Sequence, residues 1–193
     1  MSAFPAELRA SSPPPTVRLL LLAEVVVFIA LAAACLWLTP RRHASREWYH
    51  TVLWIFTGVL PVAANLLHGD RPRDSGIRMD NFFASAKEVG AVTLGLALVL
   101  VLTGLIFDGF DHPTRPGRVF RMGLRLIGGG LIQQYALQAF VLRRLRQAGL
   151  GPVLAVVVAV GLFAGIHWPN WVLVGLTVGG GAAWCAMFLR RPN

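Results

Sequence analysis

The sequence predicts an all-α integral membrane protein with about six transmembrane helices. Of its 193 residues, 55% are hydrophobic and only 14% are charged, whereas soluble domains carry about 25% charged residues. The mean hydropathy is +0.62, and the apolar residues lie in long runs. Such runs are typical of membrane-spanning helices, because a helix needs about 20 apolar residues to cross the hydrocarbon core.

Six apolar runs have roughly the length of a bilayer span. They are Val17–Leu38, Trp48–Leu67, Val89–Phe107, Val119–Leu142, Pro152–His167 and Trp171–Leu189. The fifth run is short, and Trp168-Pro169-Asn170 joins it to the sixth, so we expect these two to form a tight helical hairpin. We divide the chain into a polar tail (1–16), N-terminal membrane helices (17–117) and a core of later helices (118–193).

The net charge of +9 comes from arginines in short groups between the apolar runs. These groups lack interleaved aromatics and any nucleic-acid motif, which excludes nucleic acid as a partner. The lipid bilayer is the predicted partner. More basic residues fall on the side of the N-terminus, so we expect a multi-pass protein of the plasma membrane (the inner membrane of a bacterium) with both termini in the cytoplasm. Cys35 and Cys185 lie in apolar runs without CxxC spacing, which gives no support for a metal site or a disulfide.

The stretch LIGGGLIQQYALQAFVLRRL carries three glutamines, Gln133, Gln134 and Gln138, inside an apolar run. Counting back from Arg143 at 1.5 Å per residue puts the first two about 14–15 Å from the membrane edge, near the middle of the core. Gln134 and Gln138 are four residues apart and share a helix face. Two interpretations remain open: interhelical hydrogen bonds, worth about 0.6 kcal/mol each, or a polar pocket that forms a site.

Other polar residues also stand out. His167 is the only histidine in an apolar run, and it is either a structural hydrogen-bonding residue or part of a site. Glu24 lies in the first run and is either a functional acid or a side chain that reaches the interface. Asp108, Asp111 and His112 have metal-ligand chemistry, but a short proline-bounded loop of this kind is usually solvated.

Small residues predict where helices approach one another. Gly161 and Gly165 are four apart, and so are Gly175 and Gly179. This spacing lets helix backbones come close in membranes. We therefore expect both pairs to be helix-packing surfaces.

Two motifs resemble those of the CPBP family, which includes CAAX prenyl endopeptidases and Abi-type bacteriocin-immunity proteins. In QQYALQAFVLRRL, Gln133 and Gln134 stand at the glutamate positions of the family's Glu-Glu-x-x-x-Arg motif, and Gln138 stands at the arginine position. In FAGIHWPN, Phe163 and His167 match the second motif, Phe-x-x-x-His.

The resemblance covers residues 118–193 and implies an intramembrane endopeptidase. In the family, the first glutamate and the histidine of the second motif activate water, and a later helix brings a second histidine. The chain ends at Asn193, before such a helix, so we expect the core to be incomplete. Some members are described as metalloproteases; a metal such as zinc would involve His167 here only if a metal takes part, and the sequence itself requires no cofactor.

The chain departs from the family pattern in its charges. Gln133 cannot take a proton at ordinary pH, so it cannot be the general base. We therefore expect a CPBP-like protein with weak or lost peptidase activity. It would bind a membrane-embedded or lipidated partner in a cavity formed by the three glutamines and His167. One alternative is an active endopeptidase (CAAX-type processing or bacteriocin self-immunity) whose final catalytic helix is missing from this chain. A second is a small transporter subunit, suggested by Glu24 but lacking the internal repeat typical of transporters.

Overall fold

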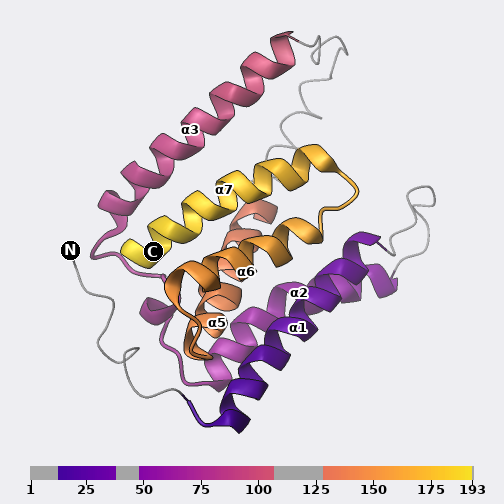
Figure 1. Cartoon of the computed structure of the whole chain (residues 1–193), viewed down its shortest axis with the longest axis vertical. Coiled ribbons are helices and arrows are strands. Elements are labelled where there is room, and N and C mark those ends of the chain that lie inside the picture. Colours follow the sequence, from indigo (N-terminus) through magenta and orange to yellow (C-terminus); the bar gives the residue numbers. More distant parts are fainter. Residues whose placement is uncertain (1–12, 38–47, 107–127, 193) are drawn as a thin grey trace.

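The computed structural model describes residues 13–37, 48–106 and 128–192 (Figure 1). Every regular element in these ranges is helical, which confirms the all-α prediction. The elements are α1 (Pro15–Trp37), α2 (Trp48–Leu67), the short 3₁₀ helix η2 (Pro72–Ser75), α3 (Phe82–Ile106), the π-helix η3 (Tyr135–Leu142), α5 (Arg143–Gln147), α6 (Pro152–Gly165) and α7 (Trp171–Arg190). Residues 128–134 are α-helical and lead directly into η3.

The helices follow the predicted apolar runs. Three of them, α1, α3 and α7, are long and apolar enough to cross a membrane. Shorter apolar helices cover Ile55–Leu67 and Pro152–Gly165, and the number of six spans stays a prediction. The first part of the fourth predicted run, before residue 128, lies outside the described residues, as do the Asp108–His112 loop and most of the polar tail.

α3 shows how the chain depends on a lipid environment. This helix has 25 residues, and Ser85 is its one buried residue. It packs against α7 and leans away from the rest of the bundle (Figure 1). Its apolar side chains would be costly to expose to water, whereas lipid tails are as apolar as they are. This exposure agrees with an integral membrane protein.

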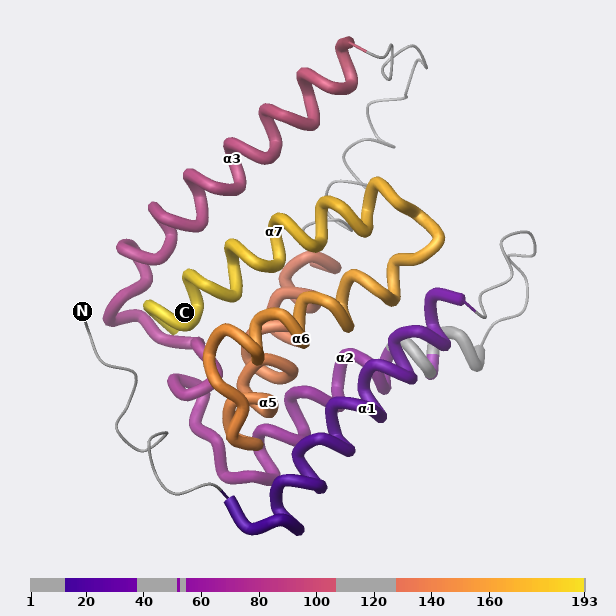
Figure 2. Tube along the Cα trace, viewed as in Figure 1, coloured from indigo at the N-terminus to yellow at the C-terminus, as the bar shows by residue number. Residues whose placement is uncertain are grey.

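The π-helix η3, which follows directly after Gln133 and Gln134, lies at the centre of the bundle. η3 packs against α2, α6 and α7, and α5 packs against α1 and α6 (Figure 2). The apolar side chains of η3 are almost completely buried, with Phe140 and Leu142 at 0% exposure and Leu137 at 1%. The hydrophobic core therefore forms around this segment, with α1, α2, α6 and α7 packed against it.

A buried asparagine on α2 holds the π-helix. Asn65 is 2% exposed, and its Nδ2 donates to the carbonyl of Ala139 at 3.2 Å and to the hydroxyl of Tyr135 at 3.0 Å. A third contact of Nδ2 reaches Ser75 Oγ at 3.3 Å. π-Helical turns are rare and often occur at functional sites. Asn65 thus fixes the helix that carries the first motif to α2.

The predicted hairpin of the last two runs is confirmed. α6 and α7 pack against each other (Figure 1), and five residues connect them, from Ile166 to Asn170. Asn170 is the N-cap of α7, because its Oδ1 accepts from the N–H of Leu173 at 3.1 Å. A side-chain oxygen in this position satisfies one of the unpaired N–H groups at a helix start. The N-cap therefore fixes the residue at which the connection ends and α7 begins.

The prediction for the glycine pairs is wrong. A Cβ atom placed on Gly161, Gly165, Gly175 or Gly179 would meet nothing within 4 Å. All four glycines face away from the neighbouring helices. The close approach occurs instead at Gly181, where a Cβ atom would lie 3.5 Å from Val160 and 3.6 Å from Leu137. The spacing of small residues indicated the right helices but not the face that packs.

Candidate functional site

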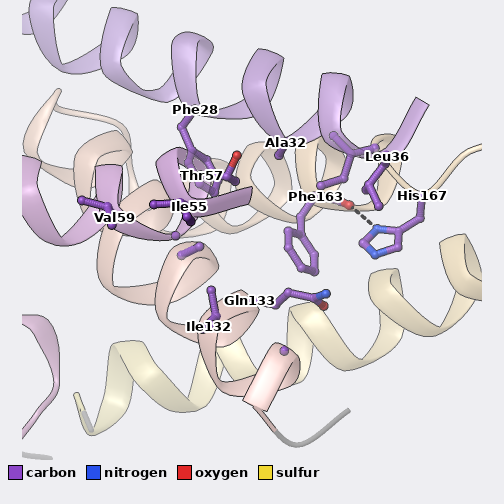
Figure 3. A pocket seen from close by; sticks show the side chains of 14 residues that line it. Phe28, Ala32, Leu36, Ile55, Thr57, Val59, Ile132, Gln133, Phe163 and His167 are labelled. Carbon is purple, nitrogen blue, oxygen red and sulfur yellow. Dashed lines mark hydrogen bonds between the residues drawn. The ribbon is translucent and has the colours of Figure 1, made fainter. Parts of the chain in front are cut away.

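One cavity of about 580 Å³ lies between four helical segments (Figure 3). Its walls come from α1, α2, the helix at residues 129–136 and the end of α6. The lining residues are Phe28, Ala32, Leu36, Ile55, Thr57, Gly58, Val59, Gly129, Ile132, Gln133, Ala136, Phe163, Ile166 and His167. The volume lies in the range typical of ligand pockets, and a mostly apolar lining with a few polar groups is also typical of them. We call this cavity the central pocket.

The helical repeat explains which side chains reach the central pocket. α1 contributes three residues spaced four apart, and the helix at 129–136 contributes residues at i, i+3, i+4 and i+7. Both spacings select a single face of a helix. The polar side chains among the lining residues are Thr57, Gln133 and His167, and none of them carries a formal charge when the histidine is neutral.

His167 is oriented by its own helix turn. α6 tightens at its end, where the N–H of His167 donates to Ala164 O at 3.0 Å. The carbonyl of Phe163 accepts from the imidazole Nδ1 instead, at 2.8 Å, and the two rings meet edge to face with centroids 5.2 Å apart. A carbonyl oxygen can only accept, so Nδ1 carries the proton and Nε2 of the neutral ring is left as an acceptor. The Phe-x-x-x-His spacing allows this contact, because residues four apart lie about one helical turn from each other.

Gln133 lies across the central pocket from α1. Its side chain is exposed to the cavity, and its amide end extends toward the side on which Phe163 and His167 lie (Figure 3). An amide both donates and accepts hydrogen bonds but does not titrate. Gln133 can therefore orient a polar group in the pocket, but it cannot remove a proton from it.

The other two glutamines do not line the central pocket. Gln138 Nε2 donates to Gln134 Oε1 at 2.9 Å, so the two amides pair along one face of the helix. Gln138 also borders a small space of about 10 Å³ near Ser85, Glu88 and Arg191, on the side of α3 and α7. Of the four candidate residues, the structure thus brings Gln133 and His167 to one pocket and directs Gln134 and Gln138 elsewhere.

A network of ion pairs lies beside the pocket. Arg144 is fully buried, and its Nε donates to Glu24 at 2.7 Å while its Nη1 lies 3.4 Å from Asp70. His68 Nε2 lies 2.6 Å from the second oxygen of Glu24, and Arg143 donates to Asp70 at 2.5 Å. We call these five side chains the Glu24 cluster. It joins α1 to α5 and to the turn after α2.

Sequence reasoning treated the arginines of the Glu24 cluster only as indicators of membrane topology. The available signal was Glu24 itself, because an acid inside an apolar run needs a partner. The partner, Arg144, is 120 residues away in the sequence. No local pattern indicates which of the basic residues it would be.

Two phenylalanine rings connect the Glu24 cluster to the central pocket. The guanidinium of Arg144 lies over the ring of Phe140, with 5.4 Å between Cζ and the ring centroid. Phe140 meets Phe28 edge to face at 5.5 Å, and Phe28 lines the pocket. Arg144, Phe140 and Phe28 therefore form a continuous series of contacts from the ion pairs to the lining of the pocket.

The residues of the central pocket do not fit a zinc site. Zinc is held by three or four nitrogen, sulfur or carboxylate ligands. Among the lining residues of the described structure, His167 is the one side chain of such a type. No group of three or more His, Cys, Asp or Glu that could hold a metal occurs within residues 13–37, 48–106 and 128–192.

A comparison with protein-family models finds a match in the C-terminal region. Residues 115–193 match the model described as type II CAAX prenyl endopeptidase Rce1-like. Over these residues the chain is similar to the CAAX prenyl endopeptidase family. The Rce1-like region contains both motifs, and it contributes Gln133, Phe163 and His167 to the central pocket. Neither the curated proteins nor the solved structures include a significant match to the chain.

Proposed function

We propose that this CAAX-protease-like membrane protein binds a lipidated or membrane-embedded peptide in the central pocket, with weak or lost peptidase activity. The observation that carries the proposal is an apolar pocket that holds Gln133 and His167, the residues at two motif positions, with an amide where the family has a carboxylate. The apolar lining suits a lipid chain, and the two polar side chains suit a peptide group attached to it.

The chemistry of Gln133 supports weak or lost hydrolysis. In the family, a glutamate and a histidine together activate water. An amide can hold a water molecule by hydrogen bonds but cannot accept its proton. General base catalysis contributes about 10²–10⁴-fold to a rate, so the change at Gln133 is expected to cost a large part of that factor.

One observation favours a second candidate, an endopeptidase that retains activity in CAAX-type processing or bacteriocin self-immunity. The contact of His167 Nδ1 with Phe163 O leaves Nε2 as a proton acceptor at the pocket. A neutral imidazole in this orientation has the chemistry of a general base. In this candidate His167 takes the proton of the attacking water, and Gln133 orients that water.

The test uses the full chain in lipid nanodiscs with a fluorescent farnesylated peptide. Binding is followed by fluorescence anisotropy and cleavage by mass spectrometry. We expect wild-type protein to bind the peptide without turnover, and Gln133→Leu to weaken binding. Gln133→Glu is expected to raise turnover, whereas the same substitution outside the pocket, Gln138→Glu, is not. Cleavage by wild-type protein that His167→Ala abolishes would refute the first candidate and support the second.

We also propose a multi-pass protein of the plasma membrane with both termini in the cytoplasm. The support is the larger number of basic residues at the helix ends on the N-terminal side, such as Arg18, Arg71, Arg73 and Arg190. Reporter fusions at the two termini test this orientation. An alkaline phosphatase fusion that is active at either end would contradict it.

A further inference from the structure

One face of α1 forms part of the wall of the central pocket. Phe28, Ala32 and Leu36 line the cavity, and Glu24 lies one turn earlier on the same face of the helix. Among the described residues, the outer face of α1 is uncovered: Val26 is 66% exposed, Leu19 67% and Leu20 55%. The opposite wall, around Gln133, lies on the helical turns that lead into η3, and η3 itself packs against α2, α6 and α7.

Polar contacts hold α1 near both ends of this wall. Toward the start of the helix, Glu24 contacts Arg144 at 2.7 Å and His68 at 2.6 Å. At the other end, Trp37 Nε1 donates to the carbonyl of Ile166 at 3.0 Å, next to His167. Between these contacts, the lining side chains of α1 are apolar. A further contact lies between them, from Cys35 Sγ to Thr57 Oγ1 on α2 at 3.3 Å. A thiol is only a weak donor or acceptor, so the contacts of Glu24 and Trp37 are the stronger polar restraints on the position of α1.

We propose that α1 is the movable wall of the central pocket and that the contacts of Glu24 and Trp37 control entry of its ligand. The proposal rests on the proposed function, because it concerns regulation of the same pocket. Glu24 acts through Arg144 and Phe140 on Phe28, so it is a positioning residue and does not touch the ligand. When these contacts are weakened, α1 moves outward into lipid and the pocket opens to the membrane.

Spin labels on the outer faces of two helices measure the position of the wall. Val27 on α1 and Val157 on α6 are 50% and 61% exposed, and both can carry a label through an introduced cysteine. The native Cys35 and Cys185 are buried, and both are replaced by alanine so that labelling stays confined to the introduced cysteines when α1 moves. Pulsed electron paramagnetic resonance then gives the α1–α6 distance distribution in nanodiscs without any ligand.

Two variants weaken the polar contacts of α1, one near each end of the pocket wall. Glu24→Gln weakens the ion pairs, and Trp37→Phe removes the indole N–H donor while it keeps an aromatic ring. The matched control is Glu88→Gln, which removes the acid of an exposed pair with Arg191 at 2.8 Å on α3 and α7. We expect both test variants to broaden the α1–α6 distribution toward longer distances. The entry rate of the fluorescent farnesylated peptide should rise about tenfold, the factor that matches loss of one charge-assisted hydrogen bond.

The outcomes separate this inference from the proposed function. Unchanged distances in folded variants would overturn the movable wall, and so would broadened distances with an unchanged entry rate. If no variant binds the peptide, the proposed function fails, and with it the control of ligand entry, while the ligand-free distances still decide whether α1 moves. If Glu24→Gln does not fold, Trp37→Phe decides the question, because it leaves no buried charge without a partner.

Discussion

Removal of the buried guanidinium of Arg144 should cost the protein much of its stability. Loss of one member of a buried ion pair typically costs about 3–5 kcal/mol, because the partner charge stays buried. Here both acids keep a second partner, since Glu24 retains His68 at 2.6 Å and Asp70 retains Arg143 at 2.5 Å. We therefore expect Arg144→Met to lower the free energy of unfolding by about 2–4 kcal/mol. Methionine keeps an apolar side chain against Phe140, so the change mainly removes the charge.

The assay is equilibrium unfolding in mixed micelles, followed by circular dichroism. Its control is Arg191→Met, which breaks the pair with Glu88, whose side chains are 45% and 41% exposed. Exposed pairs contribute about 0–1 kcal/mol. If the two variants unfold within about 0.5 kcal/mol of each other, a difference that exposed sites commonly show, the Glu24 cluster does not stabilise the fold as its burial implies.

Three further substitutions test other parts of the structure. Asn65→Leu removes three hydrogen bonds of a buried amide and should cost about 2–3 kcal/mol in the same unfolding assay; a neutral effect would show that Asn65 does not hold the π-helix. Asn170→Ala removes the N-cap of α7 and should cost about 1 kcal/mol, with faster amide hydrogen exchange confined to the first turn of α7. Ala136→Trp places a large ring in the central pocket and should weaken binding of the farnesylated peptide at least about tenfold, which unchanged affinity would contradict.

The local patterns of the sequence predicted much of the fold. The apolar runs predicted the helices, and the short linker Trp168-Pro169-Asn170 predicted the hairpin, because both features depend on residues close together in the chain. The spacing of Phe163 and His167 likewise depends on a single helix turn, and their contact at 2.8 Å follows from it. The glutamines were less predictable. Gln133 and Gln134 lie about 100° apart around the helix, so only one of them faces the central pocket.

Contacts between distant segments could not be predicted in the same way. The Glu24 cluster joins three parts of the chain, and the choice of Arg144 over the neighbouring arginines depends on how α1 packs against α5. The glycine pairs failed for a related reason. Their spacing identifies a face with small side chains, but the packing of α7 on α6 uses Gly181.

Photo-crosslinking with a diazirine-labelled farnesylated peptide tests the central claim most directly, because mass spectrometry then identifies the residues that the peptide contacts. If the peptide binds in the central pocket, adducts should form on the pocket walls: on α1 around Ala32, at residues 129–136 and around Phe163. It also predicts that these adducts disappear in Ala136→Trp. Adducts confined to the lipid-exposed side chains of α3, with none in the pocket, would contradict the claim.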